Sequence, residues 1–310
     1  MVFCAAVSIF APAKINLYLH VVGRRSDGYH LLDSLVAFAD IGDRLSAAPA
    51  AGLSLTVDGP ESGAIAALGD DNLVLRAARL LAEAAAARSP RAVAYGAALH
   101  LDKRLPASSG IGGGSSDAAA TLRILNTMWG CPLDPPALAA LAPKLGADTP
   151  ACLAARPAWV GGIGELLAPA AGLPPLGIVL ANPRRPLPTP CVFAARRGAF
   201  TTSGRFDPPP GDTDAFLALL ANQRNDLTDA AATLVPEIAT VLACLAGLPG
   251  ACLARMSGSG ATCFALFADR DAAAAAAQVL ARAEPQWWSA AGVLLTAPPQ
   301  VEQQAGDASD

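Results

Sequence analysis

The first hundred residues alternate between hydrophobic and polar positions in several stretches, a pattern typical of half-buried β-strands. Residues 5–22 predict a strand, a break at Pro12 and a second strand, and residues 31–40 and 44–57 predict two more. Residues 72–88 follow a helical period instead, because their leucines and alanines recur at three- and four-residue spacing. This part of the chain therefore predicts several strands and one amphipathic helix.

The rest of the chain mixes strand and helix patterns in no regular order. The strand patterns occupy five segments: 94–101, 158–167, 176–182, 251–256 and 263–268. The helical patterns occupy five more: 117–129, 136–145, 213–222, 227–248 with a break near Pro236, and 272–283. Because strands and helices do not alternate as βαβ units, the order favours an α+β fold over a doubly wound sheet.

Length and composition limit the possible function classes. The chain has 310 residues, enough for two domains, and its 53% hydrophobic and 15% charged residues exclude a disordered protein. Much of the hydrophobicity is alanine, and no stretch reaches the about 20 strongly apolar residues of a membrane helix. The net charge of -4 gives no basic field for DNA or RNA. We therefore expect neither a membrane nor a nucleic-acid partner.

Cysteine and lysine usage adds two expectations. Seven cysteines are scattered without a C-x-x-C motif, which argues against a disulfide framework or a Cys/His zinc site and favours a reducing, cytoplasmic location. The apolar N-terminus lacks the basic residues that open a signal peptide. Of the 22 basic residues only Lys14, Lys103 and Lys144 are lysines. A lysine that lies in a motif is therefore of interest, because its compact ammonium differs from the planar guanidinium of arginine.

A glycine- and serine-rich loop at 106–116 is the strongest candidate for ligand binding. Its glycines allow backbone amides to approach a ligand closely, and the helix that follows adds unpaired N–H groups and a positive dipole end. The pattern predicts a cradle for phosphate groups, with a flexible linker as the alternative. It matches neither the dinucleotide G-x-G-x-x-G motif nor the P-loop motif.

Four further segments carry candidate chemistry. Lys14 and Asn16 lie on the same face of one predicted strand. The lysine would either bind a phosphate group or discourage aggregation at the edge of a sheet. Tyr29 and His30 follow a turn and suit either base recognition or a hairpin. Asp148 lies at a chain reversal, either as a base for a hydroxyl proton or as a helix N-cap. A Ser-Gly-Ser-Gly turn at 257–260 suggests a second close approach to a ligand, or a tight hairpin.

Taken in order, these motifs resemble those of the GHMP kinase superfamily. The chain is most similar to the branch that phosphorylates a cytidine-diphosphate-linked methylerythritol in non-mevalonate (MEP pathway) terpenoid synthesis. Eight spaced segments carry this resemblance: A-P-A-K-I-N-L at 11–17, G-R-R-S-D-G-Y-H at 23–30, D-N-L-V-L-R-A-A-R-L-L at 71–81, D-K-R-L-P at 102–106, G-G-G-S-S-D-A-A-A at 112–120, L-G-A-D-T-P at 145–150, G-I-G-E-L-L at 162–167 and P-T-P-C-V-F at 188–193.

The resemblance implies a two-domain GHMP fold. Residues 1–155 would form an N-terminal nucleotide-binding domain of the ribosomal-protein-S5-domain-2-like type, with a left-handed βαβ unit. Residues 156–296 would form a C-terminal α+β domain that completes the substrate site. By composition, residues 297–310 are expected to form a disordered tail.

The same resemblance implies a role for each candidate residue. Lys14 and Asp148 would be catalytic, with Asp148 also contacting substrate. The other substrate-binding positions would be Asn16, Tyr29, His30, Thr189 and Phe193, with Tyr29 and Phe193 on either side of a cytosine. The ATP-binding positions would be Lys103, Pro106, Ala107, Ser108, Ser109, Gly110, Ile111, Gly112, Gly113, Gly114, Ser115 and Ser116.

Cofactors, partners and competing functions complete the set of expectations. ATP is expected as co-substrate with Mg²⁺, whose ligands the sequence does not identify, and the protein is expected to be a monomer or homodimer. Ser108 and Ser109 depart from the small residues and glycines of the family loop. The competing interpretations are a GHMP kinase for another small molecule, a non-catalytic nucleotide-binding protein, and a Rossmann oxidoreductase.

Overall fold

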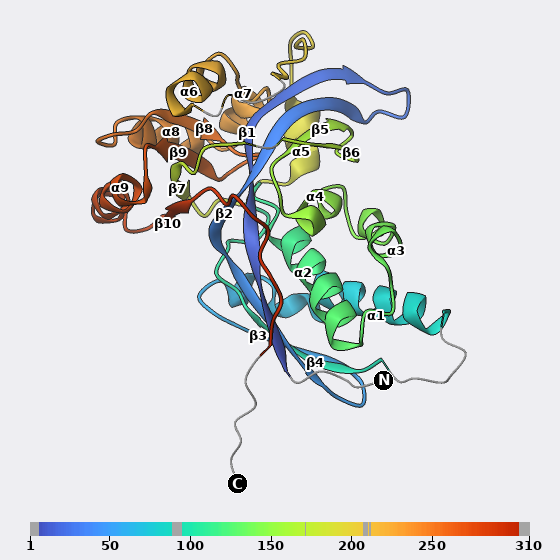
Figure 1. The fold of residues 1–310 in the computed structure, drawn as a ribbon. Helices are drawn as coiled ribbons and strands as arrows, with labels where there is room; N and C mark the ends of the chain where they lie inside the picture. The colour runs from blue at the N-terminus through green and yellow to red at the C-terminus, as the bar shows by residue number, and fades with distance from the viewer. Residues whose placement is uncertain (1–5, 89–94, 171, 207–209, 211, 304–310) are drawn as a thin grey trace.

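A long antiparallel pair of strands forms the backbone of the molecule (Figure 1). The structure is a computed structural model that describes residues 6–88, 95–170, 172–206, 210 and 212–303. β1 (Val7–Arg24) and β2 (His30–Pro49) pair along nearly their whole length. The first sheet also contains β3 (Leu53–Asp58), β4 (Ala97–Asp102), β5 (Ala158–Gly162), β6 (Leu166–Pro169) and β11 (Glu302–Gln303).

Four helices cover one side of this first sheet, seen to the right of β1 and β2 in Figure 1. They are α1 (Leu73–Ala86), α2 (Gly113–Met128), α3 (Pro135–Ala139) and α4 (Thr149–Ala154). Leu81, Leu125 and Leu101 are fully buried between α1, α2 and the sheet. α1 lies between β3 and its parallel neighbour β4 in the order of the chain, as in a βαβ unit, and the left-handed crossover that the family resemblance implies stays a prediction. Three 3₁₀ turns complete this half: Ser62–Ala64, Ala66–Asp71 and Ala142–Lys144.

A second, antiparallel sheet lies beside the first and has the strand order β10-β7-β9-β8. Its strands are β7 (Gly177–Asn182), β8 (Leu253–Met256), β9 (Cys263–Phe267) and β10 (Trp288–Val293). The helices of this half are α5 (Thr189–Ala195), α6 (Thr213–Ala221), α7 (Thr228–Leu234), α8 (Glu237–Ala246) and α9 (Arg270–Ala283). Ile15 and Leu17 of β1 share one buried cluster with Leu180 and Phe264, so the two sheets are packed together.

Two expected boundaries moved for identifiable reasons. The predicted break at Pro12 is a bulge between Pro12 and Ala13 inside one continuous strand, which is a position that tolerates a missing N–H. α2 begins at Gly113, four residues earlier than predicted, because the glycine pattern was interpreted as loop. A side chain at Gly113 would lie 3.2 Å from the Lys103 ammonium, so packing requires glycine within this helix.

The expected domain limits are only partly visible in these elements. β5 and β6 follow residue 155 yet pair with the first sheet, and the division at residues 155 and 156 stays a prediction. Within the tail expected to be disordered, Glu302 and Gln303 pair with β1, while residues 304–310 lie outside the described residues. No helix in the described ranges is both long and apolar enough to cross a bilayer.

Candidate active site

Lys14 and Asn16 point from β1 toward Asp148, which comes from a distant part of the sequence. The Lys14 Nζ donates to Asn16 Oδ1 at 3.1 Å and to Asp148 Oδ1 at 2.7 Å. Asn16 in turn donates from Nδ2 to the Ser34 hydroxyl on β2 at 2.8 Å. The side chain of Lys14 is 6% exposed, whereas that of Asp148 is 46% exposed. A buried ammonium therefore holds one oxygen of a carboxylate that solvent can still reach.

Asp148 does not act as a helix cap, although it stands at the N-cap position of α4. Its side chain makes no capping hydrogen bond, and its backbone φ and ψ are -82° and -17°. A capping aspartate has an extended backbone and accepts from an amide in the first helical turn. The carboxylate bonds Lys14 instead, so the geometry favours the functional interpretation of this residue over the capping one.

The glycine loop passes directly over Lys14. The Lys14 amide donates to the Ile111 carbonyl at 2.9 Å, and a Cβ added to Gly112 would lie 3.2 Å from the Lys14 Cβ. Gly112 is the N-cap of α2 and has a φ of +64°. α2 has 16 residues, and its first turn follows this loop directly. The unpaired N–H groups and the positive dipole end of the helix therefore lie next to the loop and to Lys14. The positive N-terminal end of α2 thus lies beside the Lys14–Asp148 ion pair.

The loop side chains divide into an inner and an outer set. Ser109 and Ser116 are buried, and their hydroxyls donate to the carbonyls of Pro106 and Pro12, both at 2.7 Å. Ala107, Ser108 and Gly114 are exposed and Ser115 is half-buried. Ser108 has a φ of +49°, a left-handed conformation that costs energy for any residue but glycine. The departure from the family loop therefore leaves local strain at Ser108.

The Ser257–Gly260 turn closes the site from the second sheet. The Ser257 hydroxyl accepts from the Asn16 amide at 3.1 Å and donates to the Gly110 carbonyl at 3.1 Å. Thr262 donates from its amide to the Ser109 carbonyl at 3.1 Å. The turn expected to make a second close approach thus contacts both β1 and the loop.

Lys103 lies beneath the loop and faces away from its exposed side. Its ammonium, 2% exposed as a residue, bonds Asp43 Oδ2 at 2.5 Å and Asp117 Oδ2 at 2.9 Å. Asp43 Oδ1 also accepts the amides of Arg104 at 2.6 Å and Leu105 at 2.8 Å. The pKa of Lys103 is raised because the two carboxylates outweigh the opposing effect of burial. These contacts give Lys103 a supporting position under the loop, and the expected contact with ATP stays a prediction.

Of the three rings expected at the nucleobase, two stack on each other and the third is exposed. His30 stacks on Phe193 with ring centroids 5.2 Å apart and an interplanar angle of 24°. Tyr29 is 61% exposed. Burial, followed by Arg24 and Arg196, lowers the pKa of His30 and favours its neutral ring. Thr189 shares a hydrogen bond of 2.7 Å with Ser259 of the turn.

Sequence reasoning missed two acidic residues at this site. Asp117 belongs to the quoted G-G-G-S-S-D segment, so its place in a motif was a usable signal. Asp43 had no such signal, because only the pairing of β1, β2 and β4 brings it under the loop. Across the described ranges no cluster of three His, Cys, Asp or Glu side chains is arranged to hold a metal.

Comparisons with known proteins agree with this architecture. The model of the GHMP kinases N terminal domain matches residues 72–156, and that of the GHMP kinases C terminal matches residues 210–286. A 4-diphosphocytidyl-2-C-methyl-D-erythritol kinase of Paramagnetospirillum magneticum is 52% identical over 291 residues, covering 93% of this chain and 99% of the relative. The chain belongs to this family of GHMP kinases.

Further members support the family and the fold. The 4-diphosphocytidyl-2-C-methyl-D-erythritol kinase of Methylobacterium radiotolerans is 53% identical over 286 residues, covering 90% of this chain and 96% of the relative. The crystal structure of a 4-(cytidine 5'-diphospho)-2C-methyl-D-erythritol kinase matches with a TM-score of 0.74 at 38% identity, covering 93% and 98%. A homoserine kinase of Cytophaga hutchinsonii matches with a TM-score of 0.72 at 18% identity, covering 97% and 98%, and shares the fold alone. The predicted α+β GHMP fold and kinase class are confirmed.

Proposed function

We propose that the protein transfers the γ-phosphate of ATP to the 2-hydroxyl of 4-diphosphocytidyl-2-C-methyl-D-erythritol, a step of non-mevalonate isoprenoid synthesis. The family membership supports the reaction, and the 2.7 Å contact between Lys14 Nζ and Asp148 Oδ1 carries the mechanism. We also infer that it works in the cytoplasm as a monomer or homodimer. Its described cysteines are all free, which suits a reducing compartment.

Asp148 is the proposed acceptor of the hydroxyl proton. One of its oxygens binds Lys14, and the half-exposed position of the carboxylate leaves the other oxygen open to a substrate hydroxyl. A general base must reach the proton by a direct hydrogen bond or through one water. Lys14 fixes the orientation of the carboxylate, and Asn16 and Ser34 fix the orientation of Lys14.

The loop and α2 are proposed to hold the ATP phosphates. The positive end of α2 and the exposed backbone of the loop suit an anion, and Lys14 lies directly below. Phosphoryl transfer depends mainly on positioning and on stabilisation of developing negative charge. Lys103 would act through the loop, since its ammonium is occupied by Asp43 and Asp117.

The residues present fit a Mg²⁺ ion that travels on the phosphates. Mg²⁺ keeps several waters and needs few protein ligands. The Ser115 hydroxyl, which lies 3.8 Å from a Cβ built on Gly146, is the side-chain oxygen of the loop that would hold it. When bound, the ion would neutralise phosphate charge during transfer.

The cytidine end is proposed to lie at Tyr29, His30 and Phe193. The neutral ring of His30 can donate to and accept from the edge of a base, and Phe193 offers a stacking face. Thr189, whose hydroxyl is shared with Ser259, is placed to contact the bound substrate near the Ser257–Gly260 turn.

The proposal is tested by measuring ATP-dependent phosphorylation of 4-diphosphocytidyl-2-C-methyl-D-erythritol with Mg²⁺. Wild type should turn over, and Asp148→Asn should lower kcat by about 10²–10⁴-fold. The matched control is Asp271→Asn, which changes an exposed carboxylate of α9 and should leave kcat unchanged. Phosphorylation of homoserine or mevalonate in place of this acceptor would reject the proposed substrate, and full turnover in Asp148→Asn would reject the base.

A further inference from the structure

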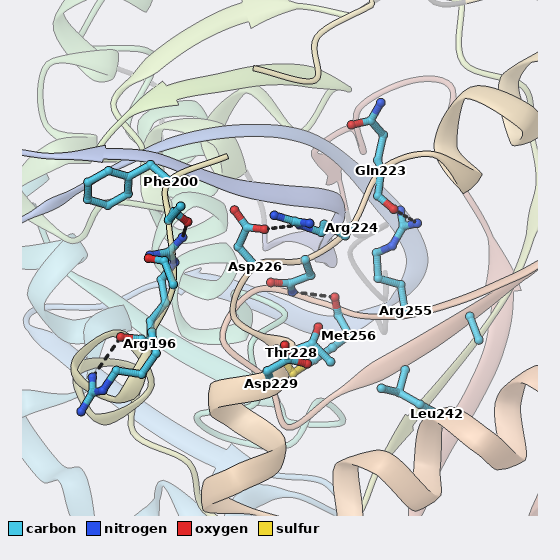
Figure 2. Close-up of a pocket in the computed structure, with 15 residues that line it drawn as sticks. Arg196, Phe200, Gln223, Arg224, Asp226, Thr228, Asp229, Leu242, Arg255 and Met256 are labelled. Carbon is cyan, nitrogen blue, oxygen red and sulfur yellow. Dashed lines mark hydrogen bonds and ion pairs between the residues drawn. The ribbon is translucent and has the colours of Figure 1, made fainter. Parts of the chain in front are cut away.

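A cavity of about 490 Å³ lies in the C-terminal half, and neither Lys14 nor Asp148 belongs to its lining (Figure 2). Its walls are the 196–200 segment after α5, the 223–229 segment at the start of α7, and β8. No residue of the 106–116 loop lines it. The cavity is therefore distinct from the loop and the Lys14–Asp148 pair, although Arg196 in its lining also acts electrostatically on His30.

The cavity carries an excess of positive charge. Four arginines line it, Arg196, Arg197, Arg224 and Arg255, against the two carboxylates Asp226 and Asp229. Figure 2 shows Arg196 on one side of the space, with Arg224 and Arg255 across from it. Clefts lined by one sign of charge concentrate ligands of the opposite sign.

Three of these arginines have only carbonyl partners among the described residues. Arg196 donates to the carbonyls of Gly198 and Ala199, and Arg197 to those of Ala194 and Arg196. Only Arg224 has a carboxylate partner, Asp226 Oδ1 at 2.6 Å. A carbonyl satisfies a guanidinium N–H without neutralising its charge, so these arginines keep their positive charge in the lining of the cavity.

Arg255 is the most enclosed of the four. It is 7% exposed and donates to the carbonyls of Leu17, Leu220 and Gln223 at 2.6 to 2.9 Å. Burial lowers the pKa of Arg255 to about 10, which still leaves it charged at neutral pH. A buried cation without a carboxylate partner is costly, and an arriving anion would reduce that cost.

At the rim of the cavity the guanidinium of Arg196 lies over the ring of Phe200. The Arg196 guanidinium carbon lies 5.3 Å from the centroid of the Phe200 ring, and Phe200 is 50% exposed. The Arg196 Nε is shielded from solvent and has no hydrogen-bond partner. Buried donors are normally paired, so this N–H indicates a missing acceptor.

We propose that this cavity binds a small metabolite through a diphosphate group. Guanidinium groups match phosphate oxygens in a planar, two-pronged geometry, and four arginines belong to the lining of a space large enough for a small ligand. Two linked phosphates bring enough negative charge to offset the excess of arginines, whereas a carboxylate brings only one. Phe200 offers an apolar face to the rest of the molecule.

Asn225 connects the cavity to the catalytic half. It lines the space, and its Nδ2 donates to the carbonyls of Met256 and Gly258, both at 2.8 Å. Gly258 packs against Gly110 of the phosphate loop. An occupant of the cavity would therefore contact the wall that supports this loop, and we expect it to change the KM for ATP by about two- to five-fold.

The test titrates inorganic pyrophosphate calorimetrically into the full chain, with the phosphate loop saturated by a non-hydrolysable ATP analogue. Wild type should still bind one equivalent, and Arg196→Gln/Arg197→Gln should bind at least ten-fold more weakly. The matched control Arg282→Gln, an exposed arginine of α9, should bind as wild type does. Asp229→Asn, which removes a negative charge from the cavity, should bind about three-fold more tightly, a gain that a misfolded variant would not show.

Three results would overturn the proposal. Complete displacement of pyrophosphate by the analogue would place its binding in the catalytic loop. Equal affinity in wild type and the double arginine variant would remove the cavity from the interaction. Orthophosphate binding as tightly as pyrophosphate would reject the diphosphate assignment. These binding measurements do not depend on the identity of the phosphorylated alcohol, so they are distinguishable from a failure of the proposed reaction.

Discussion

Gly110 and Gly258 are packed back to back, joining the 106–116 loop to the Ser257–Gly260 turn of the second sheet. A Cβ on Gly258 would lie 2.5 Å from the Gly110 carbonyl oxygen, and a Cβ on Gly110 would lie 2.6 Å from the Ser257 carbonyl oxygen. Both glycines have positive φ, +76° and +55° respectively. Backbone thus meets backbone with no space for a side chain, so the position of the loop depends on the C-terminal half.

Gly110→Ala should separate the loop from the turn. The added methyl meets backbone atoms that cannot rotate away, so the loop must shift, and we expect the KM for ATP to rise at least ten-fold. Steady-state kinetics with varied ATP measure this change.

Gly130→Ala is the matched control for that substitution. Gly130 also has a positive φ, +81°, but nothing lies within 4 Å of its added Cβ. It should lose about 1 kcal/mol of stability with an unchanged KM for ATP. An equal rise of KM in both variants would show that backbone strain, and not the contact with the turn, controls the loop.

Lys14→Arg should lower kcat although it keeps the charge. The side chain of Lys14 runs beneath Gly112, whose added Cβ would lie 3.3 Å from the Lys14 Cε, and a planar guanidinium does not fit the same path to Asp148. We expect a loss of about 10²-fold in kcat, measured at saturating substrates. Lys144→Arg changes an exposed lysine and serves as the control. Wild-type kcat in Lys14→Arg would show that charge alone is required.

Asp117→Asn should change how stability depends on pH. Burial raises the pKa of Asp117 from 3.8 to about 7, against the lowering effect of Lys103 and with a further rise from Asp43. The folded state therefore holds a proton that the unfolded state releases, so this stabilising contribution is complete below about pH 3.8 and is lost as the pH rises toward 7. Asparagine does not titrate, so the Asp117→Asn variant does not lose stability in this way as the pH rises.

Thermal unfolding from pH 4 to 8 tests this expectation. The Tm of Asp117→Asn, taken relative to wild type, should rise between pH 4 and 7 and then level off. Asp271→Asn, on the surface of α9, should follow the wild-type curve. A constant difference across this range would mean that Asp117 does not titrate there.

Phe193→Ala should weaken the binding of the cytidine substrate without weakening the binding of ATP. Phe193 stacks on His30 and is proposed to face the base, and removal of a stacking ring costs about 1–3 kcal/mol, or roughly five- to 150-fold in KM for that substrate. The KM for ATP is the internal control and should not change. A parallel rise in both KM values would indicate general damage to the C-terminal half.

Local pattern was sufficient for most elements and for the side-by-side placement of Lys14 and Asn16. The helical period over residues 72–88 appears as α1, and the strand pattern of 176–182 appears as β7. Lys14 and Asn16 were placed on one strand face by their spacing alone, and the structure joins their side chains. These features were predictable because side-chain direction in a strand or helix follows directly from residue spacing.

Tertiary structure decided the features that join distant segments. The residues around Asp148 taken alone favoured capping, the family resemblance implied a catalytic role, and the contact with Lys14, 134 positions away, distinguishes the two. Lys103 was expected at the phosphates because its motif adjoins the loop, yet Asp43 and Asp117 bind its ammonium beneath that loop. A sequence specifies which charges are present, whereas the packing of sheets and helices determines which of them meet and which are shielded from water.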